Sequence, residues 1–231
     1  MIKISIIIPA FNEQNTIIQL LEKVKNVEIE GFEKEIIVVD DCSNDDTLLL
    51  LDRNKNLYTK LIKLKVNGGK GAAVKKGLLN ATGEYILFQD ADLEYDPSDY
   101  EKLLKPVSNF NADIVFGSRL TASQLTRVYY FWHKLGNKFI TFVFNILNNT
   151  TFTDIYSCYL LFKSDLLKPE DLFSDGWDQQ AEILSLLVSR GKSFYEVPVN
   201  YYGRTYEEGK KIRAHHAVAV LLTILKKRFF R

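Results

Sequence analysis

The chain of 231 residues contains little cysteine and almost no net charge. Its two cysteines, Cys42 and Cys158, do not form a spacing typical of a metal site, so we expect two ordinary thiols in a reducing cytoplasm. The net charge is only +1, so no overall positive field favours nucleic acid as a partner. Basic residues are instead concentrated near the C-terminus, at Lys210, Lys211, Arg213, Lys226, Lys227, Arg228 and Arg231.

The chain also lacks a hydrophobic run long enough to cross a bilayer. A spanning helix needs about 18–20 apolar residues, and no stretch of the sequence reaches that length. We expect no signal peptide, because residues 3–9 already have the pattern of a strand. Internal repeats and low-complexity linkers are absent as well. We therefore expect a single domain over residues 1–231 that is not an integral membrane protein on its own.

The first half of the chain alternates apolar runs with helical patterns. A composition of 46% hydrophobic and 26% charged residues suits a globular domain with a sizeable core. Strands are predicted at residues 4–8, 35–39, 60–66, 85–88 and 114–116, and helices at 13–24, around 48–51, at 71–79 and at 97–104. This order is typical of βαβ units. It predicts an α/β fold with a Rossmann-like, mostly parallel sheet flanked by helices on both faces.

The second half contains longer helices with aromatic and basic side chains. Helices are predicted at 128–147, broken by Gly136, at 181–188 and at 215–230, with strands at 159–162 and 193–199. The helices at 128–147 and 215–230 fit amphipathic helices that lie at a lipid–water interface, where basic residues attract anionic lipid. A buried core helix and an oligomer contact are the alternatives.

Asp90 and Asp92 are the most informative pair in the sequence. They follow the apolar run 85–88, which is typical of a buried parallel strand. Side chains two residues apart on a strand point to the same side, and two adjacent anions repel unless a cation lies between them. A hard divalent ion with a phosphate-bearing substrate explains the pair; the alternative is a solvated loop. Pro9, Asp40 and Asp41 also follow or end strands, where ligands of such sheets bind.

Five segments then occur in a characteristic order, at residues 7–13, 38–43, 67–73, 90–94 and 116–119. They contain Pro-Ala-Phe-Asn-Glu after the first strand, Asp-Asp after the second, Gly-Gly-Lys-Gly before a helix, Asp-Ala-Asp at 90–92 and Gly-Ser-Arg at the fifth strand. In this order they resemble the family-2 glycosyltransferases with a GT-A fold. Within that family they are most similar to the dolichyl-phosphate mannose and polyprenyl-phosphate sugar synthases, over nearly the whole chain.

The resemblance implies an inverting glycosyltransferase. It would move a hexose, most often mannose, from a nucleoside-diphosphate sugar to a polyprenyl or dolichyl phosphate, with GDP-mannose or UDP-glucose as donor and Mg²⁺ or Mn²⁺ as cofactor. Residues 1–120 would bind the nucleotide sugar, and residues 121–231 would bind the acceptor and the membrane. The protein would be cytoplasmic and peripheral at the cytoplasmic face of the membrane, with a membrane protein or a second copy of the chain as a further partner.

The resemblance also implies roles for individual side chains. Asp92 would hold the metal, with Asp90 and Glu94 beside it. Arg119 would bind the acceptor phosphate, with Arg127 or His133 as a second contact, and it would complete the catalytic set with the two aspartates. The nucleotide sugar would be bound by Pro9, Ala10, Phe11, Glu13, Asp40, Asp41, Lys70, Asp90, Arg204 and Lys211.

Several of these roles have plain structural alternatives. Asn12 would cap a helix that has Glu13 in its first turn, and Asp40 and Asp41 would cap the helix after the second strand. Lys70 would equally suit a structural turn, and Arg119 a surface ion pair. For Glu94 the alternative is an ordinary surface acid. For the basic stretch near Arg204 it is a simple contact with anionic lipid.

The sequence departs from the family pattern at a few positions. Cys42 stands where glycine is usual, and because cysteine tolerates a positive φ less well, we expect a different turn there. His133 stands where the mannose synthases tend to carry arginine, and its alternative is a packed helix histidine. Cys158 and Tyr159 replace the glycine and phenylalanine of the segment that begins at Asp154.

The choice of acceptor depends on whether a general base is present. A lipid phosphate is already an anion and needs positioning, whereas a sugar hydroxyl needs a base. No base stands out, with Glu182 and Asp154 as the candidates, and this favours the phosphate. The alternatives are a family-2 enzyme that uses UDP-glucose or a saccharide acceptor in surface glycan synthesis, and a non-catalytic α/β binding module.

Overall fold

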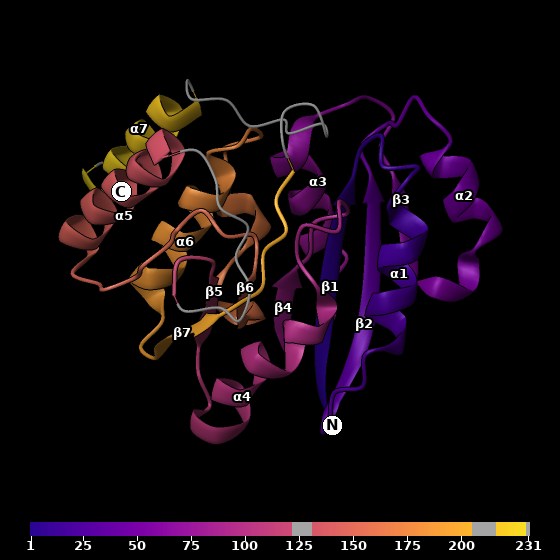
Figure 1. Cartoon of the computed structure of the whole chain (residues 1–231), viewed down its shortest axis with the longest axis horizontal. Coiled ribbons are helices and arrows are strands. Elements are labelled where there is room, and N and C mark those ends of the chain that lie inside the picture. Colours follow the sequence, from indigo (N-terminus) through magenta and orange to yellow (C-terminus); the bar gives the residue numbers. More distant parts are fainter. Residues whose placement is uncertain (122–130, 205–215, 230–231) are drawn as a thin grey trace.

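A computed structural model of the chain describes residues 1–121, 131–204 and 216–229. Its centre is a seven-stranded sheet in the order β3-β2-β1-β4-β6-β5-β7 (Figure 1). The strands are β1 Ile2–Ala10, β2 Phe32–Asp40, β3 Lys60–Lys63, β4 Tyr85–Phe88, β5 Ile114–Ser118, β6 Leu160–Lys163 and β7 Phe194–Pro198. Every neighbouring pair is parallel except those of β6, which runs antiparallel to β4 and β5. The prediction of a mostly parallel sheet is confirmed.

Helices cover both faces of this sheet because its central strands are apolar on both sides. On β2, Ile36 and Val38 belong to the main core, while Ile37 and Val39 pack with Ala73 of α3 on the other face. The α-helices are α1 Ile17–Asn26, α2 Thr47–Arg53, α3 Gly69–Leu78, α4 Tyr100–Phe110, α5 Phe131–Asn148, α6 Gln179–Arg190 and α7 His216–Phe229. The short helical turns are η1 Lys55–Leu57, η2 Pro97–Asp99, η3 Ser164–Leu166 and η4 Pro169–Asp171.

The main core joins the two halves of the chain. One cluster of buried side chains runs from Ile4 on β1 to Ile224 on α7. Helices α5 and α7 contact each other and α6, and they lie side by side at the end of the molecule away from β3 (Figure 1). Within the described residues, no helix combines the length and the apolar character needed to cross a bilayer.

Some element boundaries differ from the sequence prediction. The first helix begins at Ile17 rather than at residue 13, because the N–H groups of Thr16 and Ile17 both bond to Glu13 O in a turn. The predicted break at Gly136 is wrong: α5 runs through it from Phe131. Glycine costs about 1 kcal/mol there relative to alanine, but burial of Phe144 and its neighbours on the core supports the helix.

The carboxyl ends of β1, β2 and β4 meet at one edge of the sheet. Ala10 pairs with Asp40, and the N–H of Asp41 bonds to Ala10 O. The N–H of Gln89 bonds to Ile7 O, directly after β4 ends. The segments that follow these strands are therefore neighbours, although they are far apart in the sequence.

Candidate functional site

The two aspartates after β4 each have a basic partner of their own. Lys70 Nζ lies 2.5 Å from Asp90 Oδ1, and Arg204 Nη2 lies 2.9 Å from Asp92 Oδ2. Both acids lie beyond the strand, which ends at Phe88. This agrees with the prediction that they follow the strand's carboxyl end, and the divalent ion predicted between them stays a prediction. Two separate side-chain cations offset their charges.

An unusual turn places Asp92 and Glu94. Leu93 between them has a φ of 63°, a left-handed conformation that branched side chains seldom adopt. In this turn the N–H of Glu94 donates to Asp92 Oδ1 over 3.0 Å. Backbone strain of this kind is found most often at functional sites, where the surrounding structure maintains it.

Arg204 gathers three acids around one guanidinium group. Its Nη2 lies 3.6 Å from Glu13 Oε1 as well as against Asp92, and its Nε lies 3.5 Å from Glu94 Oε1. The backbone N–H of Arg204 also donates to Glu94 Oε1 over 2.7 Å. The Tyr201 hydroxyl donates to Glu94 Oε2, also over 2.7 Å. Glu94 is thus held inside the site by several partners, so it is not a plain surface acid.

The pKa of Asp92 is shifted strongly by these surroundings. Burial, and then the negative charges of Asp90 and Glu94, raise it to about 7, while Arg204 opposes the shift. Carboxyl groups displaced toward neutrality occur most often at functional sites. A second positive charge placed against Asp92 would favour the ionised carboxylate.

Lys70 supplies a lasting positive charge beside these acids. It lies in the first turn of α3, at a helix N-terminus that favours anions. Burial disfavours its charged form, but Asp90 raises the pKa of Lys70 above its ordinary value. Its Nζ also lies 5.9 Å from the centroid of the Trp177 ring. The lysine is therefore aimed at the acidic cluster rather than at solvent.

The two aspartates at the end of β2 have different surroundings. Asp41 accepts hydrogen bonds from the N–H groups of Gly68 and Gly69, each over 2.8 Å, and so fastens the turn that begins α3. Asp40 is also buried, and its Oδ2 accepts from the N–H of Ser43 over 3.2 Å. Its Oδ1 has no hydrogen-bond partner within the described part of the chain. Buried polar atoms are nearly always paired, so this oxygen suits a donor group of a bound molecule.

The loops after β1 and β2 form one unit beside these aspartates. Cys42 has a φ of 60°, the left-handed conformation that glycine would adopt, so the expectation of a different turn is wrong. The N–H of Asn44 donates to Asn12 Oδ1 over 2.8 Å, and the N–H of Asn12 donates to Ser43 Oγ over 3.0 Å. The alternative that Asp40 and Asp41 cap the next helix, α2, is wrong. The N–H of Thr47, the first residue of α2, donates to Asp45 instead.

The end of β1 brings the other predicted base-binding residues to the same edge. Pro9 and Ala10 are the last residues of β1, and Phe11 follows them. Glu13 is buried, and its N–H donates to Thr47 Oγ1 of α2 over 2.9 Å. The predicted set therefore lies between the carboxyl end of β2 and Arg204.

Arg119 is part of a buried ion pair. Its Nε donates to Asp154 Oδ2 over 2.6 Å and its Nη2 donates to Oδ1 over 2.9 Å, while the Asp154 side chain is 0% exposed. Burial alone would lower the pKa of Arg119, but Asp154 raises it well above the ordinary value. The guanidinium lies over the Tyr201 ring, 4.9 Å from its centroid, and the Tyr201 hydroxyl reaches Glu94. The alternative of an exposed surface ion pair is therefore wrong.

Of the remaining predicted residues, His133 and Glu182 lie on helices of the second half of the chain. Arg127 and Lys211 lie outside the described residues. His133 lies in the first turn of α5, which packs mainly on α6 and α7. Glu182, a candidate base, is buried under α7, where its carboxylate lies 2.6 Å from Lys227 Nζ.

Sequence reasoning missed Gln89, which organises the loop that carries the acids. The side chain is fully buried. Its Oε1 accepts from the hydroxyls of Tyr100 and Tyr159, each over 2.8 Å, and its Nε2 donates to Asp90 O over 3.0 Å and to Tyr95 O over 3.5 Å. Only an amide has both an acceptor and donors for these four partners. A lone glutamine before an acidic pair gives no local signal of this role.

Gln89→Glu is expected to destabilise the protein by about 1–3 kcal/mol, because a carboxylate oxygen would then face two backbone carbonyls with no hydrogen between them. It should also reduce enzymatic activity, because Asp90 would move. Urea unfolding and sugar-transfer rates measure both effects. Gln19→Glu, at an exposed position on α1, is the matched control and should change neither. Wild-type stability of Gln89→Glu would contradict the role of the amide.

The acids at the edge fit part of a site for a hard divalent ion. The described residues contain no group of three or more histidine, cysteine, aspartate or glutamate side chains that would enclose a metal by themselves. Mg²⁺, however, is usually held by one or two carboxylates, with substrate phosphates and water as the other ligands. Asp90 and Asp92 supply such carboxylates, and burial together with the negative charges of Asp90 and Glu94 raises the pKa of Asp92.

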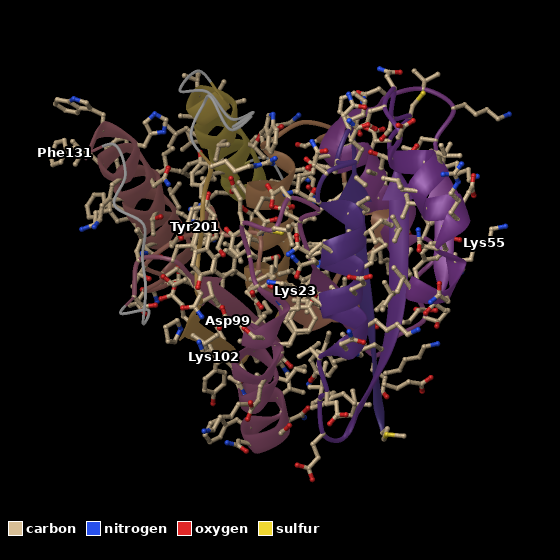
Figure 2. The ribbon with its side chains drawn as sticks, turned by 45° about the vertical axis from the view of Figure 1, so that its right-hand side comes forward. Lys23, Lys55, Asp99, Lys102, Phe131 and Tyr201 are labelled. Atoms are coloured by element: carbon tan, nitrogen blue, oxygen red, sulfur yellow. The ribbon has the colours of Figure 1, made fainter. Side chains whose placement is uncertain are left out.

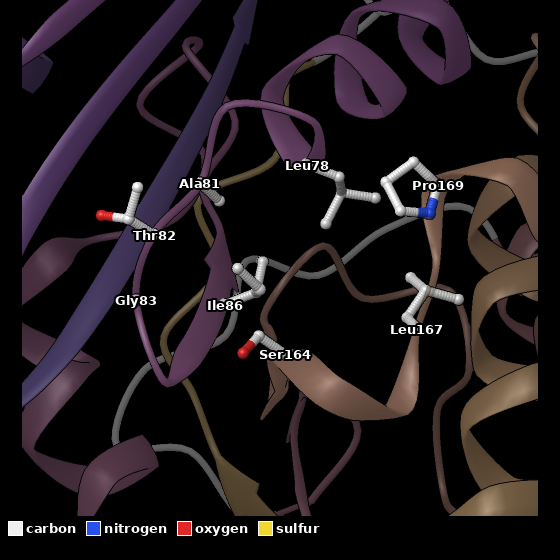
Figure 3. A pocket seen from close by; sticks show the side chains of 8 residues that line it. All are labelled: Leu78, Ala81, Thr82, Gly83, Ile86, Ser164, Leu167 and Pro169. Carbon is white, nitrogen blue, oxygen red and sulfur yellow. The ribbon is translucent and has the colours of Figure 1, made fainter.

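A separate cavity of about 280 Å³ lies at the opposite end of β4, where the strand begins (Figure 3). It is lined by Leu78, Ala81, Thr82, Gly83, Ile86, Ser164, Leu167 and Pro169. None of these lining residues carries a charge, so the cavity has no group to offset a phosphate. The charged cluster at the carboxyl ends of the strands remains the candidate active site.

The family follows from comparison with known proteins. The model of glycosyl transferase family 2 matches residues 5–168. The chain belongs to this family. Among relatives of this family-2 glycosyltransferase, the dolichol-phosphate mannosyltransferase of Pyrococcus furiosus is 28% identical over 90% of this chain and 59% of its own length. A dolichyl-phosphate beta-glucosyltransferase of Dictyostelium discoideum is 35% identical over 51% of this chain and 40% of its own length.

Solved structures support the fold of this family-2 glycosyltransferase. Glucosyl-3-phosphoglycerate synthase from Mycobacterium tuberculosis, in complex with Mn²⁺, UDP and phosphoglyceric acid, matches with a TM-score of 0.73 and 19% identity. The match covers 100% of this chain and 80% of the synthase chain. The same synthase has also been solved with Mg²⁺ and UDP, and with Mn²⁺ and UDP-glucose. The expected GT-A fold is confirmed.

Proposed function

We propose that the enzyme transfers a hexose, with inversion, from a nucleoside-diphosphate sugar to a polyprenyl or dolichyl phosphate, using Mg²⁺ or Mn²⁺. The observation that carries this proposal is the gathering of Asp90, Asp92 and Glu94 with Lys70 and Arg204 at the carboxyl ends of the strands. Carboxylates there suit a hard cation, and basic side chains suit a diphosphate. The names of two relatives, which refer to transfer to dolichol phosphates, support the acceptor.

The ion pairs of the site suggest how these groups would be used. Lys70 and Arg204 would turn from Asp90 and Asp92 to the diphosphate, and the freed carboxylates would face the divalent ion. Glu94 would hold Arg204 beside the diphosphate, because both of its oxygens already accept hydrogen bonds. The ion supplies positive charge that stabilises the leaving nucleoside diphosphate. Binding donor and metal together should therefore be stronger than binding either alone.

The acceptor phosphate would bind at Arg119. Two guanidinium N–H groups are used by Asp154, and within the described residues the others have no acceptor, so they could donate to a phosphate held near Tyr201. Asp154 and Glu182 are both engaged by basic partners, so neither resembles a free general base. A phosphate acceptor needs none, because it is already ionised at neutral pH.

A uridine nucleotide is a second candidate for the donor, beside GDP-mannose. One buried carboxylate oxygen, Asp40 Oδ1, lacks a hydrogen-bond partner among the described residues. Uracil presents one ring N–H flanked by two carbonyl groups, whereas guanine presents two adjacent donors. This buried oxygen would have to be uncovered to accept from a base, and a single acceptor would then fit the ring N–H of uracil, which favours UDP-glucose as the donor.

Helices α5 and α7 would bind the membrane surface. Their exposed apolar side chains are Phe131, Trp132, Leu135, Phe139, Phe142, Ile146, Val218, Leu222, Leu225 and Phe229. Figure 2 shows Phe131 pointing away from the body of the molecule. Lys226 and Arg228 are exposed beside them and would attract anionic lipid. The prediction that Lys227 belongs to this basic cluster is wrong, because its side chain is paired with Glu182. The enzyme would then work peripherally, at the cytoplasmic face.

The variant Trp132→Glu/Phe142→Glu is expected to bind lipid vesicles much more weakly. Each large apolar side chain contributes about 1.5–3 kcal/mol when it leaves water, and both residues are exposed on α5. Co-sedimentation with vesicles that contain phosphatidylglycerol measures the effect. Leu79→Glu is the control, because Leu79 is exposed at the end of α3. Unchanged sedimentation of the α5 variant would exclude this surface.

One experiment tests the proposed function most directly. GDP-mannose, UDP-glucose and related donors are each incubated with polyprenyl phosphate and Mg²⁺ or Mn²⁺, and sugar-linked lipid is measured. Transfer to the lipid phosphate with one donor is expected. Transfer only to soluble saccharides would support the alternative family-2 activity. If no donor bound to the protein, the result would support the alternative of a non-catalytic binding module.

A further inference from the structure

The C-terminal helix α7 is fastened by a buried ion pair. Lys227 Nζ lies 2.6 Å from Glu182 Oε1, and the Glu182 side chain is 1% exposed. One turn earlier on the same face of α7, Thr223 Oγ1 donates to Asp178 Oδ2 over 2.8 Å. Polar contacts thus attach α7 to the start of α6, while Leu222 on another face of α7 is exposed.

Glu182 also holds the loop before α6. Its carboxylate accepts hydrogen bonds from the N–H groups of Phe173 and Ser174, over 3.1 and 2.9 Å. Lys227 Nζ donates to Asp171 O over 3.3 Å and lies 4.9 Å from the centroid of the Phe173 ring. The 171–175 loop is therefore held by one carboxylate and one ammonium group.

The 171–175 loop packs directly on the start of α3. The N–H of Gly71 donates to Asp175 O over 2.9 Å. A Cβ atom at Gly71 would lie 2.5 Å from Ser174 O, so the two backbones approach as closely as glycine allows. On its other side, this turn of α3 is held by Asp41. The turn that carries Lys70 therefore has two supports.

We propose that Glu182 and Lys227 are positioning residues for the donor site, acting through the 171–175 loop on the first turn of α3 and on Lys70. This inference rests on the proposed function, which gives Lys70 the donor diphosphate. Without Lys227, Glu182 would be a buried charge with no counter-ion, a costly arrangement that favours movement of the carboxylate toward water. The loop would then lose its hydrogen bonds to Glu182, and α3 would lose one of its supports.

A purely structural pair would behave differently. It would lower the fraction of folded protein or the unfolding temperature, and the folded molecules would still bind the donor with wild-type affinity. A positioning pair changes the affinity of the folded molecules for the nucleotide. The distinguishing readout is therefore nucleotide affinity, corrected for the folded fraction.

Lys227→Met tests the inference beside its matched control, Lys226→Met. Both remove one positive charge from the same turn of α7, but Lys226 is exposed. Binding of UDP and of GDP in the presence of Mn²⁺ is measured by isothermal titration calorimetry without acceptor or lipid, and circular dichroism gives the folded fraction. Affinity for the nucleotide that the wild type binds is expected to fall about tenfold or more in Lys227→Met. It should change by no more than about twofold in Lys226→Met.

Two further variants keep the test decisive. Glu182→Gln/Lys227→Met removes both charges and leaves an oxygen to accept from the loop, so it should recover most of the lost affinity. If Lys227→Met does not fold, Glu182→Gln replaces it, and weaker binding by folded Glu182→Gln is the expected result. Wild-type affinity in the folded single variant would overturn the inference alone. Failure of the wild type to bind either nucleotide would overturn the proposed function and this inference with it.

Discussion

Asp92→Asn should reduce sugar transfer on the order of a thousandfold while making the protein more stable at pH 8. Transfer falls because asparagine offers no negative charge to a divalent ion. Stability rises because burial, Asp90 and Glu94 raise the pKa of Asp92 from 3.8 to about 7, so its ionised form is unfavourable in the folded protein. One pKa unit corresponds to about 1.4 kcal/mol, so the gain should be on the order of 2 kcal/mol or more.

The stability effect of Asp92 depends on pH because its carboxyl group binds a proton more tightly in the folded protein than in the unfolded chain. Between about pH 4 and 7 the folded carboxyl group retains a proton that the unfolded chain releases, so Asp92 lowers stability increasingly as pH rises. The advantage of Asp92→Asn should therefore be small near pH 4, increase through pH 7 and remain constant above it. Arg204 retains Glu94 and Glu13 as partners in the variant.

Urea unfolding at pH 5 and pH 8, together with transfer assays, measures both effects. Asp52→Asn is the control, because Asp52 is 42% exposed and pairs with Lys63 away from the site. It should alter neither transfer nor the pH dependence of stability. A stability gain that did not grow between the two pH values would contradict the destabilisation attributed to the ionised Asp92 carboxylate. Normal transfer by Asp92→Asn would contradict the metal-ligand role proposed for Asp92.

Local pattern was sufficient to predict most of the fold. The run at 85–88 is confirmed without change as β4, because it is apolar on both faces and ends at a polar residue. The direction of β6 could not be predicted, since an apolar run of a few residues reads the same in a parallel and an antiparallel strand. The effect of Gly136 was misjudged because packing on the core overrides an unfavourable propensity.

The sequence predicted those parts of the candidate site that directly follow the ends of strands. The position of Asp40 and of the loop after β4 at one edge follows from parallel βαβ order. The partners of these groups did not follow, because they come from distant segments. Arg204 meets Asp92 across more than a hundred residues, and Asp41 fastens the start of α3 rather than the helix that follows it. No local spacing encodes such contacts.

Arg119→Ala should both unfold the protein more readily and disrupt acceptor binding. Asp154 is 0% exposed and would lose the cation that offsets its charge, a change that typically costs about 3–5 kcal/mol. The acceptor phosphate would lose its guanidinium partner, so kcat/KM for polyprenyl phosphate should fall about a hundredfold or more. The KM for the donor should change much less, since among the described residues Arg119 is linked to the acidic cluster through Tyr201.

The double variant Arg119→Ala/Asp154→Asn separates the two effects. It removes the buried carboxylate together with its partner, and asparagine keeps an oxygen for the N–H of Tyr156. Urea unfolding should show most of the stability restored, because no uncompensated charge remains. Acceptor kinetics should stay impaired, because the phosphate still lacks its cation. If acceptor affinity returned along with stability, Arg119 would be structural only, and equal losses for donor and acceptor would exclude a specific role in binding the acceptor phosphate.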